Sequence, residues 1–239
     1  MAAAWPRVVE TVLLDAGGVL LDLDYGYLGR LIAARREPQL PPIEGDALAR
    51  LEAIARREIH RQVAAGGRVS DAWRDYFHVI LGHADVPHTE QAAMIDVLWE
   101  AHRRFGLWTR PIDGAPDIVA VLKQRGLRLG VVSNAEGRVE RDLDDAGYRG
   151  LFGTVVDSHV VGFEKPDPEI FRIAMSRLGA DPATTIHVGD VPAVDVEGAR
   201  AAGVTPLLLD RHDLYPHADS RRIRSLRELP GLLAQNEWA

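Results

Sequence analysis

The sequence predicts an α/β protein with a Rossmann-like, doubly wound parallel sheet, into which an all-helical segment is inserted. Short apolar runs rich in β-branched residues open the chain and return in its second half, as is typical of strands buried on both faces. Helical patterns separate the later runs, and this alternation favours parallel strands joined by right-handed crossovers. Between residue 22 and about residue 108 we find only helical patterns.

The core elements follow from these runs in chain order. The first strand is expected within residues 7–14, and the first core helix over 115–125, where apolar residues share one face. Further strands are expected at 127–132, 154–156, 184–188 and 205–209, with another helix over 168–178. A small group of arginines is expected to form a solvated segment near the C-terminus: Arg221, Arg222, Arg224 and Arg227.

The inserted segment shows three amphipathic stripes at helical spacing, and we interpret their aromatic residues as core packing. The stripes lie within 48–63, 73–81 and 94–105. A chain of 239 residues is long enough for one large domain that carries an insertion. We therefore expect a core domain, residues 1–21 and 109–239, and a helical domain, residues 22–108.

Composition excludes several classes of function. With no cysteine, the chain has no disulfide, thiolate nucleophile or cysteine-ligated metal, and this suits a cytoplasmic protein. The formal charge of −7 argues against broad binding to nucleic acid or anionic membrane. No apolar run approaches the roughly 18 residues of a membrane span, and the start of the chain lacks a signal-peptide pattern. Two lysines stand against 26 arginines, so each lysine is worth attention.

Two polar constellations follow early strands of the predicted core. Asp15 leaves the first strand into a glycine turn, where a carboxylate is placed to act as a nucleophile or metal ligand, or to be satisfied by turn amides. Ser133 and Asn134 end another strand. Their hydroxyl and amide groups suit an oxyanion, although for this pair alone an ordinary turn or helix cap is the better explanation.

Two more constellations lie in the second half of the chain. Lys165 precedes a helix that Asp167 caps and Pro168 begins, where a lysine suits phosphate unless it is a solvated surface residue. Asp190 and Asp195 flank a loop between strand and helix. Such paired carboxylates hold Mg²⁺, or else one caps the helix and the other faces solvent. The predicted topology gathers all four constellations at one edge of the sheet.

Together these residues resemble the motifs of the haloacid dehalogenase (HAD) superfamily of hydrolases. The resemblance covers essentially the whole chain, and its most specific parts are Lys165-Pro-Asp-Pro and Gly-Asp190…Asp195. It implies a Rossmann-like core with a helical cap between the first and second motifs, where residues 22–108 lie. The short stretch between Asn134 and Lys165 leaves no room for a cap at the family's alternative location.

The resemblance also implies a role for the catalytic and phosphate-binding residues. Asp15 matches the family's nucleophile. Ser133 and Asn134 match the motif that holds the phosphate, and Lys165 matches the lysine that steadies the nucleophile and the transferring group. The implied substrate is a small phosphorylated molecule.

The implied cofactor is Mg²⁺, held by Asp15, by Asp190 with Asp195 supporting or sharing the role, and by the backbone carbonyl of Gly17. Gly17 is also a departure from the family, because most family phosphatases carry a second aspartate at this position. That carboxylate protonates the leaving oxygen and then activates water, which is typically worth about 10²–10⁴-fold in rate. We therefore expect Mg²⁺ binding to survive and proton transfer to be impaired.

Gly17 leaves three functions open. We favour a Mg²⁺-dependent phosphatase that works through an aspartyl-phosphate at Asp15. A metal-independent 2-haloacid dehalogenase needs no proton for its halide, but the carboxylates of Asp190 and Asp195 repel a carboxylate substrate. A catalytically weakened binding or regulatory protein is the third, although a scaffold needs neither Asp15 nor Lys165. The sequence leaves the substrate and the oligomeric state open.

Overall fold

The computed structural model describes residues 5–35, 43–69 and 72–234, and the chain divides into two compact units. One unit consists of Met1–Asp22 with Thr109–Ala239, and the other is Leu23–Trp108. The chain passes between them in β2 (Leu21–Leu23) and β3 (Trp108–Pro111), which pair in a two-stranded sheet. Each unit has a hydrophobic core of its own.

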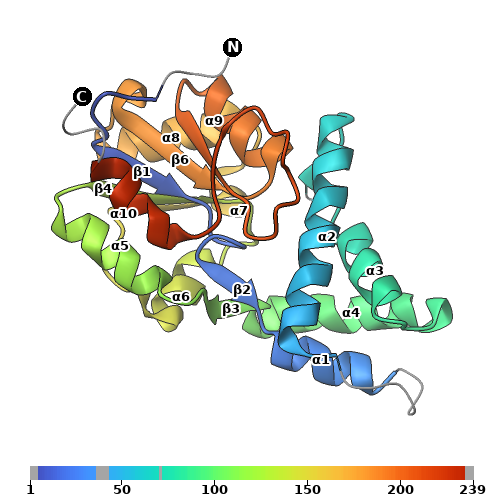
Figure 1. Ribbon diagram of the computed structural model, residues 1–239. Coiled ribbons are helices and arrows are strands. Elements are labelled where there is room, and N and C mark those ends of the chain that lie inside the picture. Colours follow the sequence, from blue (N-terminus) through green and yellow to red (C-terminus); the bar gives the residue numbers. More distant parts are fainter. Residues whose placement is uncertain (1–4, 36–42, 70–71, 235–239) are drawn as a thin grey trace. The chain divides into compact units, whose positions relative to one another are not determined.

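The first unit is built on a six-stranded sheet in the order β5-β4-β1-β6-β7-β8 (Figure 1). The strands are β1 (Thr11–Leu14), β4 (Arg128–Ser133), β5 (Thr154–Asp157), β6 (Thr185–Gly189), β7 (Thr205–Leu209) and β8 (Arg221–Ile223). All neighbouring strands are parallel, and Leu14 is aligned with Val131 on one side and Val188 on the other. The predicted fold class, a doubly wound α/β core, is confirmed.

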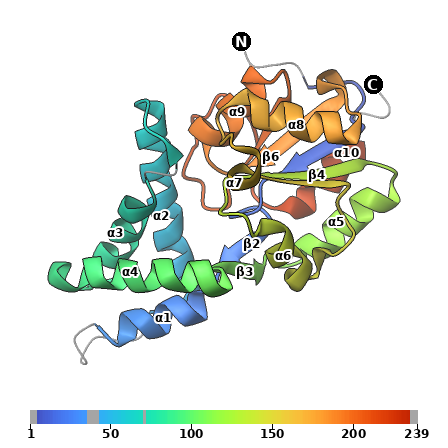
Figure 2. The same ribbon diagram turned by 180° about the vertical axis from the view of Figure 1, so that it is seen from behind.

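Helices cover both faces of this sheet (Figures 1 and 2). On one face lie α8 (Pro168–Leu178) and α9 (Glu197–Ala201), and on the other lie α5 (Ala115–Gln124), α6 (Val139–Leu143) and α10 (Leu229–Ala234). The remaining short elements are α7 (Ser158–Val161), 3-10 turns at Pro182–Thr184 and Leu226–Glu228, and π-helical turns at Asp144–Tyr148 and Pro192–Val196. This cover explains why β1 is apolar from Val12 to Leu14, since these three residues are fully buried.

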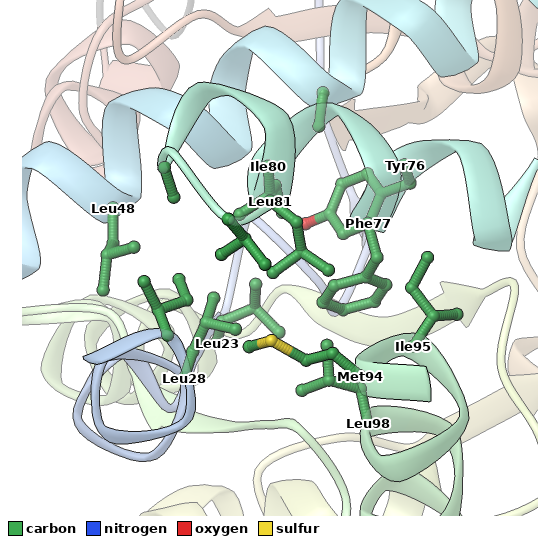
Figure 3. Close-up of a cluster of buried hydrophobic side chains, with 14 of the residues drawn as sticks. Leu23, Leu28, Leu48, Tyr76, Phe77, Ile80, Leu81, Met94, Ile95 and Leu98 are labelled. Atoms are coloured by element: carbon green, nitrogen blue, oxygen red, sulfur yellow. The ribbon is translucent and has the colours of Figure 1, made fainter. Parts of the chain in front are cut away.

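The second unit is helical. Its described helices are α1 (Tyr25–Ala33), α2 (Gly45–Ala64), α3 (Trp73–His83) and α4 (His88–Phe105). Their apolar faces meet in one cluster, in which Phe77, Ile80 and Leu98 are fully buried (Figure 3). Tyr76 and Phe77 therefore serve core packing, as the sequence predicts, whereas Phe105 of the third stripe is 66% exposed. No helix among the described residues combines the length and hydropathy that a membrane span requires.

The expectation of a wholly solvated arginine segment near the C-terminus is wrong in part. Arg221–Ile223 forms the edge strand β8, which pairs with β7. The guanidinium of Arg222 contacts the buried carboxylate of Asp210 at 2.8 Å and that of Asp213 at 2.9 Å. A partly buried ion pair at a sheet edge leaves no trace in local sequence periodicity.

A buried carboxylate, Glu52, lies in the core of the helical unit with 3% of its surface exposed. It accepts hydrogen bonds from the hydroxyl groups of Tyr25 and Tyr76, the latter at 2.7 Å, and pairs with Arg56 at 2.5 Å. Burial favours the neutral acid, but the charge of Arg56 and the two hydroxyl groups outweigh it and hold the pKa of Glu52 below its ordinary value.

Glu52→Gln is expected to lower the free energy of unfolding by about 3 kcal/mol near neutral pH, because Arg56 loses its buried partner. A lowered folded-state pKa contributes stability above the unfolded pKa, and this stability is lost as the pH falls through the folded pKa. Denaturant unfolding in steps from about pH 7 to about pH 3 checks this dependence. The control is Glu58→Gln, which breaks a more exposed pair with Arg61 on the same helix and should cost at most about 1 kcal/mol. Equal losses in both variants would contradict the expectation.

Candidate active site

Polar side chains gather at the carboxyl ends of the three central strands of the sheet. Asp15 follows β1, Ser133 ends β4 and Asp190 follows β6. β1 pairs with both β4 and β6, and the strand order reverses beside it, which is where open α/β sheets bind ligands. Carboxylate oxygens of Asp15, Asp190 and Asp195 lie within 4.8 Å of one another. Residues far apart in the sequence therefore meet at one point.

Asp15 is held at this point by the end of its strand. Its N–H donates to the carbonyl of Val188 at 2.9 Å. Its Oδ1 accepts the N–H of Ala16 at 2.7 Å and contacts the Nζ of Lys165 at 2.8 Å. Among the described residues, both contacts of the carboxylate are made by Oδ1, which leaves Oδ2 for a metal ion or a reacting atom. The side chain is 14% exposed, so it remains accessible.

Lys165 is a buried lysine between two carboxylates, which rules out a solvated surface residue. Its side chain is 1% exposed, and its Nζ lies 2.8 Å from Oδ1 of Asp15 and 2.7 Å from Oδ1 of Asp195. Burial disfavours the charged ammonium, but the charges of Asp15 and Asp195 outweigh it and raise the pKa of Lys165 above its ordinary value. A fixed positive charge therefore stands beside Asp15 at neutral pH.

The side chain of Asn134 is bound to the backbone of Lys165. Its Nδ2 donates to the carbonyl of Lys165 at 2.9 Å, and its Oδ1 accepts the N–H of Lys165 at 2.7 Å. Both ends of the amide therefore fasten the Lys165 loop to the end of β4. The preceding residue, Ser133, is buried as the last residue of that strand.

Asp195 is buried and accepts four hydrogen bonds. Its Oδ1 accepts from Nζ of Lys165 at 2.7 Å and contacts Nε2 of His187 at 3.1 Å, while its Oδ2 accepts the N–H groups of Asp190 at 3.1 Å and Val191 at 2.9 Å. Burial favours the neutral acid, but the charge of Lys165 and the hydrogen bond of His187 hold the pKa of Asp195 well below its ordinary value. The ionised carboxylate thus has partners at all four of its lone-pair positions.

Two residues of this site were not singled out from the sequence. His187 is the middle residue of β6 and is fully buried. Its only sequence signal is a polar residue between the apolar residues Ile186 and Val188 of the strand. Gly189 ends the same strand, and a Cβ atom there would lie 2.2 Å from Cγ of Asp195. Glycine at this position is therefore what allows Asp195 to pack against the strand end.

The donor set fits a hard divalent cation. Asp15, Asp190 and Asp195 bring three carboxylates together, and Lys165 supplies one compensating charge. Carboxylate and carbonyl oxygens are the ligands that Mg²⁺ prefers. Because Asp195 already has four hydrogen-bond partners, Asp15 and Asp190 are the carboxylates with the capacity to coordinate.

The chain matches a family model described as haloacid dehalogenase-like hydrolase over residues 9–203, a span that contains the whole site. The mouse haloacid dehalogenase-like hydrolase domain-containing protein 3 is 36% identical over 138 residues, 57% of this chain and 55% of that protein. Phosphoserine phosphatase from Thermus thermophilus is 34% identical over 141 residues, with the same coverage of 57% and 55%. The chain thus spans about half the length of these relatives.

Solved structures share the fold. The HAD-hydrolase YfnB from Bacillus subtilis, bound to magnesium, gives a TM-score of 0.68 at 23% identity and covers 95% of this chain and 99% of its own. The L-2-haloacid dehalogenase from Xanthobacter autotrophicus gives 0.61 at 17% identity, covering 95% and 99%. The phosphatase-named relative resembles this chain in sequence, whereas the solved structures, at 23% and 17% identity, show the shared fold alone.

Proposed function

Because the chain belongs to the haloacid dehalogenase-like hydrolase family, which confirms the resemblance of its motifs, we propose that this hydrolase is a Mg²⁺-dependent phosphatase. Its proposed substrate is a small phosphorylated molecule. The observation that carries the proposal is the 2.8 Å contact between Nζ of Lys165 and Oδ1 of Asp15, with Asp190 beside them. A carboxylate nucleophile, a buried ammonium and acidic metal ligands are the groups that phosphoryl transfer requires.

In this proposal Asp15 is the nucleophile of a two-step reaction. Its carboxylate oxygen attacks phosphorus, the bond from phosphorus to the leaving oxygen breaks, and an aspartyl-phosphate forms. The leaving oxygen departs as an anion and takes its proton from solvent, because Gly17 offers no acid. Water then attacks phosphorus and gives up a proton to solvent, the bond to Asp15 breaks, and inorganic phosphate leaves. Lys165 offsets the negative charge that collects on the transferring oxygens. Ser133 hydrogen-bonds the phosphoryl oxygens, and Asn134 keeps the Lys165 loop in place through its two amide contacts.

Mg²⁺ would be held by Asp15, Asp190 and the backbone carbonyl of Gly17. When bound, it supplies positive charge that stabilises the transferring phosphoryl group. We assign Asp195 a supporting role, because its four hydrogen bonds anchor Lys165 and the N–H of Asp190. In this proposal Asp190 coordinates the metal ion, whereas Asp195 positions Lys165 and the backbone of Asp190.

We propose that the helical unit Leu23–Trp108 is the family's cap and that the remaining segments are its core domain. This unit lies in the chain between β1, which Asp15 follows, and β4, which ends at Ser133. The lack of cysteine agrees with a cytoplasmic location, which we also propose.

A 2-haloacid dehalogenase is the second candidate, and Gly17 favours it because a leaving halide needs no proton. The charge of the site opposes it. Without a metal ion, a carboxylate substrate meets the carboxylates of Asp15, Asp190 and Asp195, with Lys165 alone to compensate. The third candidate is a binding protein without catalysis. Such a protein does not need the buried contact between Lys165 and Asp15.

Phosphate and halide release measured in parallel, with and without a chelator, test the proposed function. We expect the protein to release phosphate from an aryl phosphate in the presence of Mg²⁺, to lose this activity with EDTA, and to regain it when Mg²⁺ is added back. Halide release from 2-chloropropionate that persists in EDTA would instead establish the dehalogenase. Release of neither product, by a protein that remains folded, would support the binding protein.

A further inference from the structure

His187 lies behind the carboxylate that holds Lys165. It is aligned with Leu13 of β1 and Pro206 of β7, and none of its surface is exposed. The ring of Phe171 meets it edge to face, with centroids 4.9 Å apart and planes at 85°. A side chain enclosed in this way does not touch a substrate, so any part it takes in the reaction is indirect.

Within the part of the chain that the structure describes, the ring of His187 has one polar contact. Its Nε2 lies 3.1 Å from Oδ1 of Asp195. An ionised carboxylate only accepts hydrogen bonds, so Nε2 carries the proton and donates. Its Nδ1 is buried and has no hydrogen-bond partner among the described residues, so a proton there would lack an acceptor. The contacts therefore place a ring proton on Nε2 of this histidine.

This donor acts on the same oxygen that holds the lysine. Oδ1 of Asp195 receives Nε2 of His187 at 3.1 Å and Nζ of Lys165 at 2.7 Å. Its Oδ2 is fixed by two backbone N–H groups, so the carboxylate has no rotation that keeps all four contacts. From this anchor Lys165 reaches Asp15 at 2.8 Å. Buried contacts thus run without a break from His187 to Asp15.

We propose that His187 is a positioning residue, which fixes the orientation of the Asp195 carboxylate and thereby the place of the Lys165 ammonium beside Asp15. The catalytic consequence rests on the proposed function, in which Lys165 faces the transferring phosphoryl group. Without the N–H group of His187, one lone pair of the buried Asp195 carboxylate has no partner. The Lys165 ammonium is a mobile donor beside that carboxylate, so we expect it to move toward the open position. A small displacement of a catalytic charge is costly in rate.

Two variants of His187 separate this role from packing. In His187→Gln the amide nitrogen stands about as far from the backbone as Nε2 of histidine, whereas in His187→Asn it stands at the level of Nδ1. Both variants lose the ring contact with Phe171. The two substitutions therefore differ mainly in whether an N–H group reaches Asp195. Thermal unfolding of both variants checks that the fold is retained.

The first readout is the rate of phosphate release from an aryl phosphate by the Mg²⁺-loaded protein. His187→Asn is expected to lower kcat by about 10–100-fold with little change in KM, as is usual when a residue that orients a catalytic group is removed. His187→Gln is expected to recover most of this loss. Equal kcat values in the two variants would overturn the proposal, because ring packing alone would then account for the histidine.

The second readout observes Lys165 directly and needs no turnover. The chain has two lysines, so protein labelled with ¹⁵N at lysine Nζ gives two side-chain amine signals in NMR. Lys123 contacts the carbonyl of Gly150 at the surface and serves as the internal reference. We expect His187→Asn to shift the Lys165 signal and speed its hydrogen exchange, with Lys123 unchanged and with His187→Gln close to the original protein.

The two readouts keep the proposal and the proposed function apart. An unchanged Lys165 signal in His187→Asn would overturn the positioning role even if kcat falls, since the ammonium would not have moved. If the unaltered protein releases no phosphate, the proposed function fails, while the amine signals still decide whether His187 positions Lys165.

Discussion

Asp15→Asn is expected to lower kcat for aryl phosphate hydrolysis by at least about 10⁴-fold, the scale on which removal of a catalytic nucleophile acts. The amide has no charge and cannot form the acyl phosphate. Lys165 keeps its second partner, Asp195, at 2.7 Å, so the substitution leaves the buried lysine paired. Steady-state kinetics in Mg²⁺ give the measurement, and substrate binding is expected to survive because the phosphate-holding groups remain.

A matched control is available at another aspartate of the same unit. Asp181 is exposed and caps a 3-10 turn, with its Oδ1 accepting the N–H of Ala183 at 2.9 Å. Asparagine caps equally well, so Asp181→Asn should leave kcat near that of the original protein. If Asp15→Asn and Asp181→Asn both retain activity, the nucleophile has been assigned to the wrong residue.

Gly17→Asp is expected to raise kcat/KM for an alkyl phosphate by about 10²-fold, because it supplies a carboxyl group to protonate the leaving oxygen. Aryl phosphates should gain much less, since their leaving groups depart without a proton. The backbone permits the change: Gly18 has a φ of 78°, whereas Gly17 is not among the described glycines with positive φ. The original protein should accordingly hydrolyse aryl and acyl phosphates far better than alkyl phosphates.

The control for this gain is Gly17→Asn, which adds a side chain of similar size without a titratable group. It should leave the preference for aryl over alkyl phosphates intact. A gain of equal size in Gly17→Asn, or equal rates of the original protein on alkyl and aryl phosphates, would mean that proton transfer is not what Gly17 removes.

Much of the core could be predicted because buried elements carry a simple pattern. β7 and α8 have the bounds that the sequence predicts, 205–209 and 168–178. α1 was missed, because Gly26 and Gly29 interrupt a short helix whose one clear signal is the cap at Asp24. β8 was missed because it lies at the edge of the sheet and pairs only with β7 in that sheet, so its sequence does not need to be apolar.

The candidate site divides in a similar way. Topology brings Asp15, Asp190 and Lys165 to one place, as expected from parallel strands that end at a common edge. The partners of Asn134 and Asp195 could not be predicted, because they depend on side-chain directions and on distances between segments. Motif spacing indicates which residues meet, and tertiary packing decides which atom contacts which.

The most direct test of the central claim is to trap the covalent intermediate. During turnover of an aryl phosphate, acid quenching followed by borohydride reduction converts an aspartyl-phosphate into homoserine, which peptide mass spectrometry locates. Because Gly17 supplies no base to activate water, the second step should be slow and the intermediate should accumulate. We expect modification at Asp15 in the original protein and none in Asp15→Asn. Sustained phosphate release without modification at Asp15, or with modification at another residue, would contradict it.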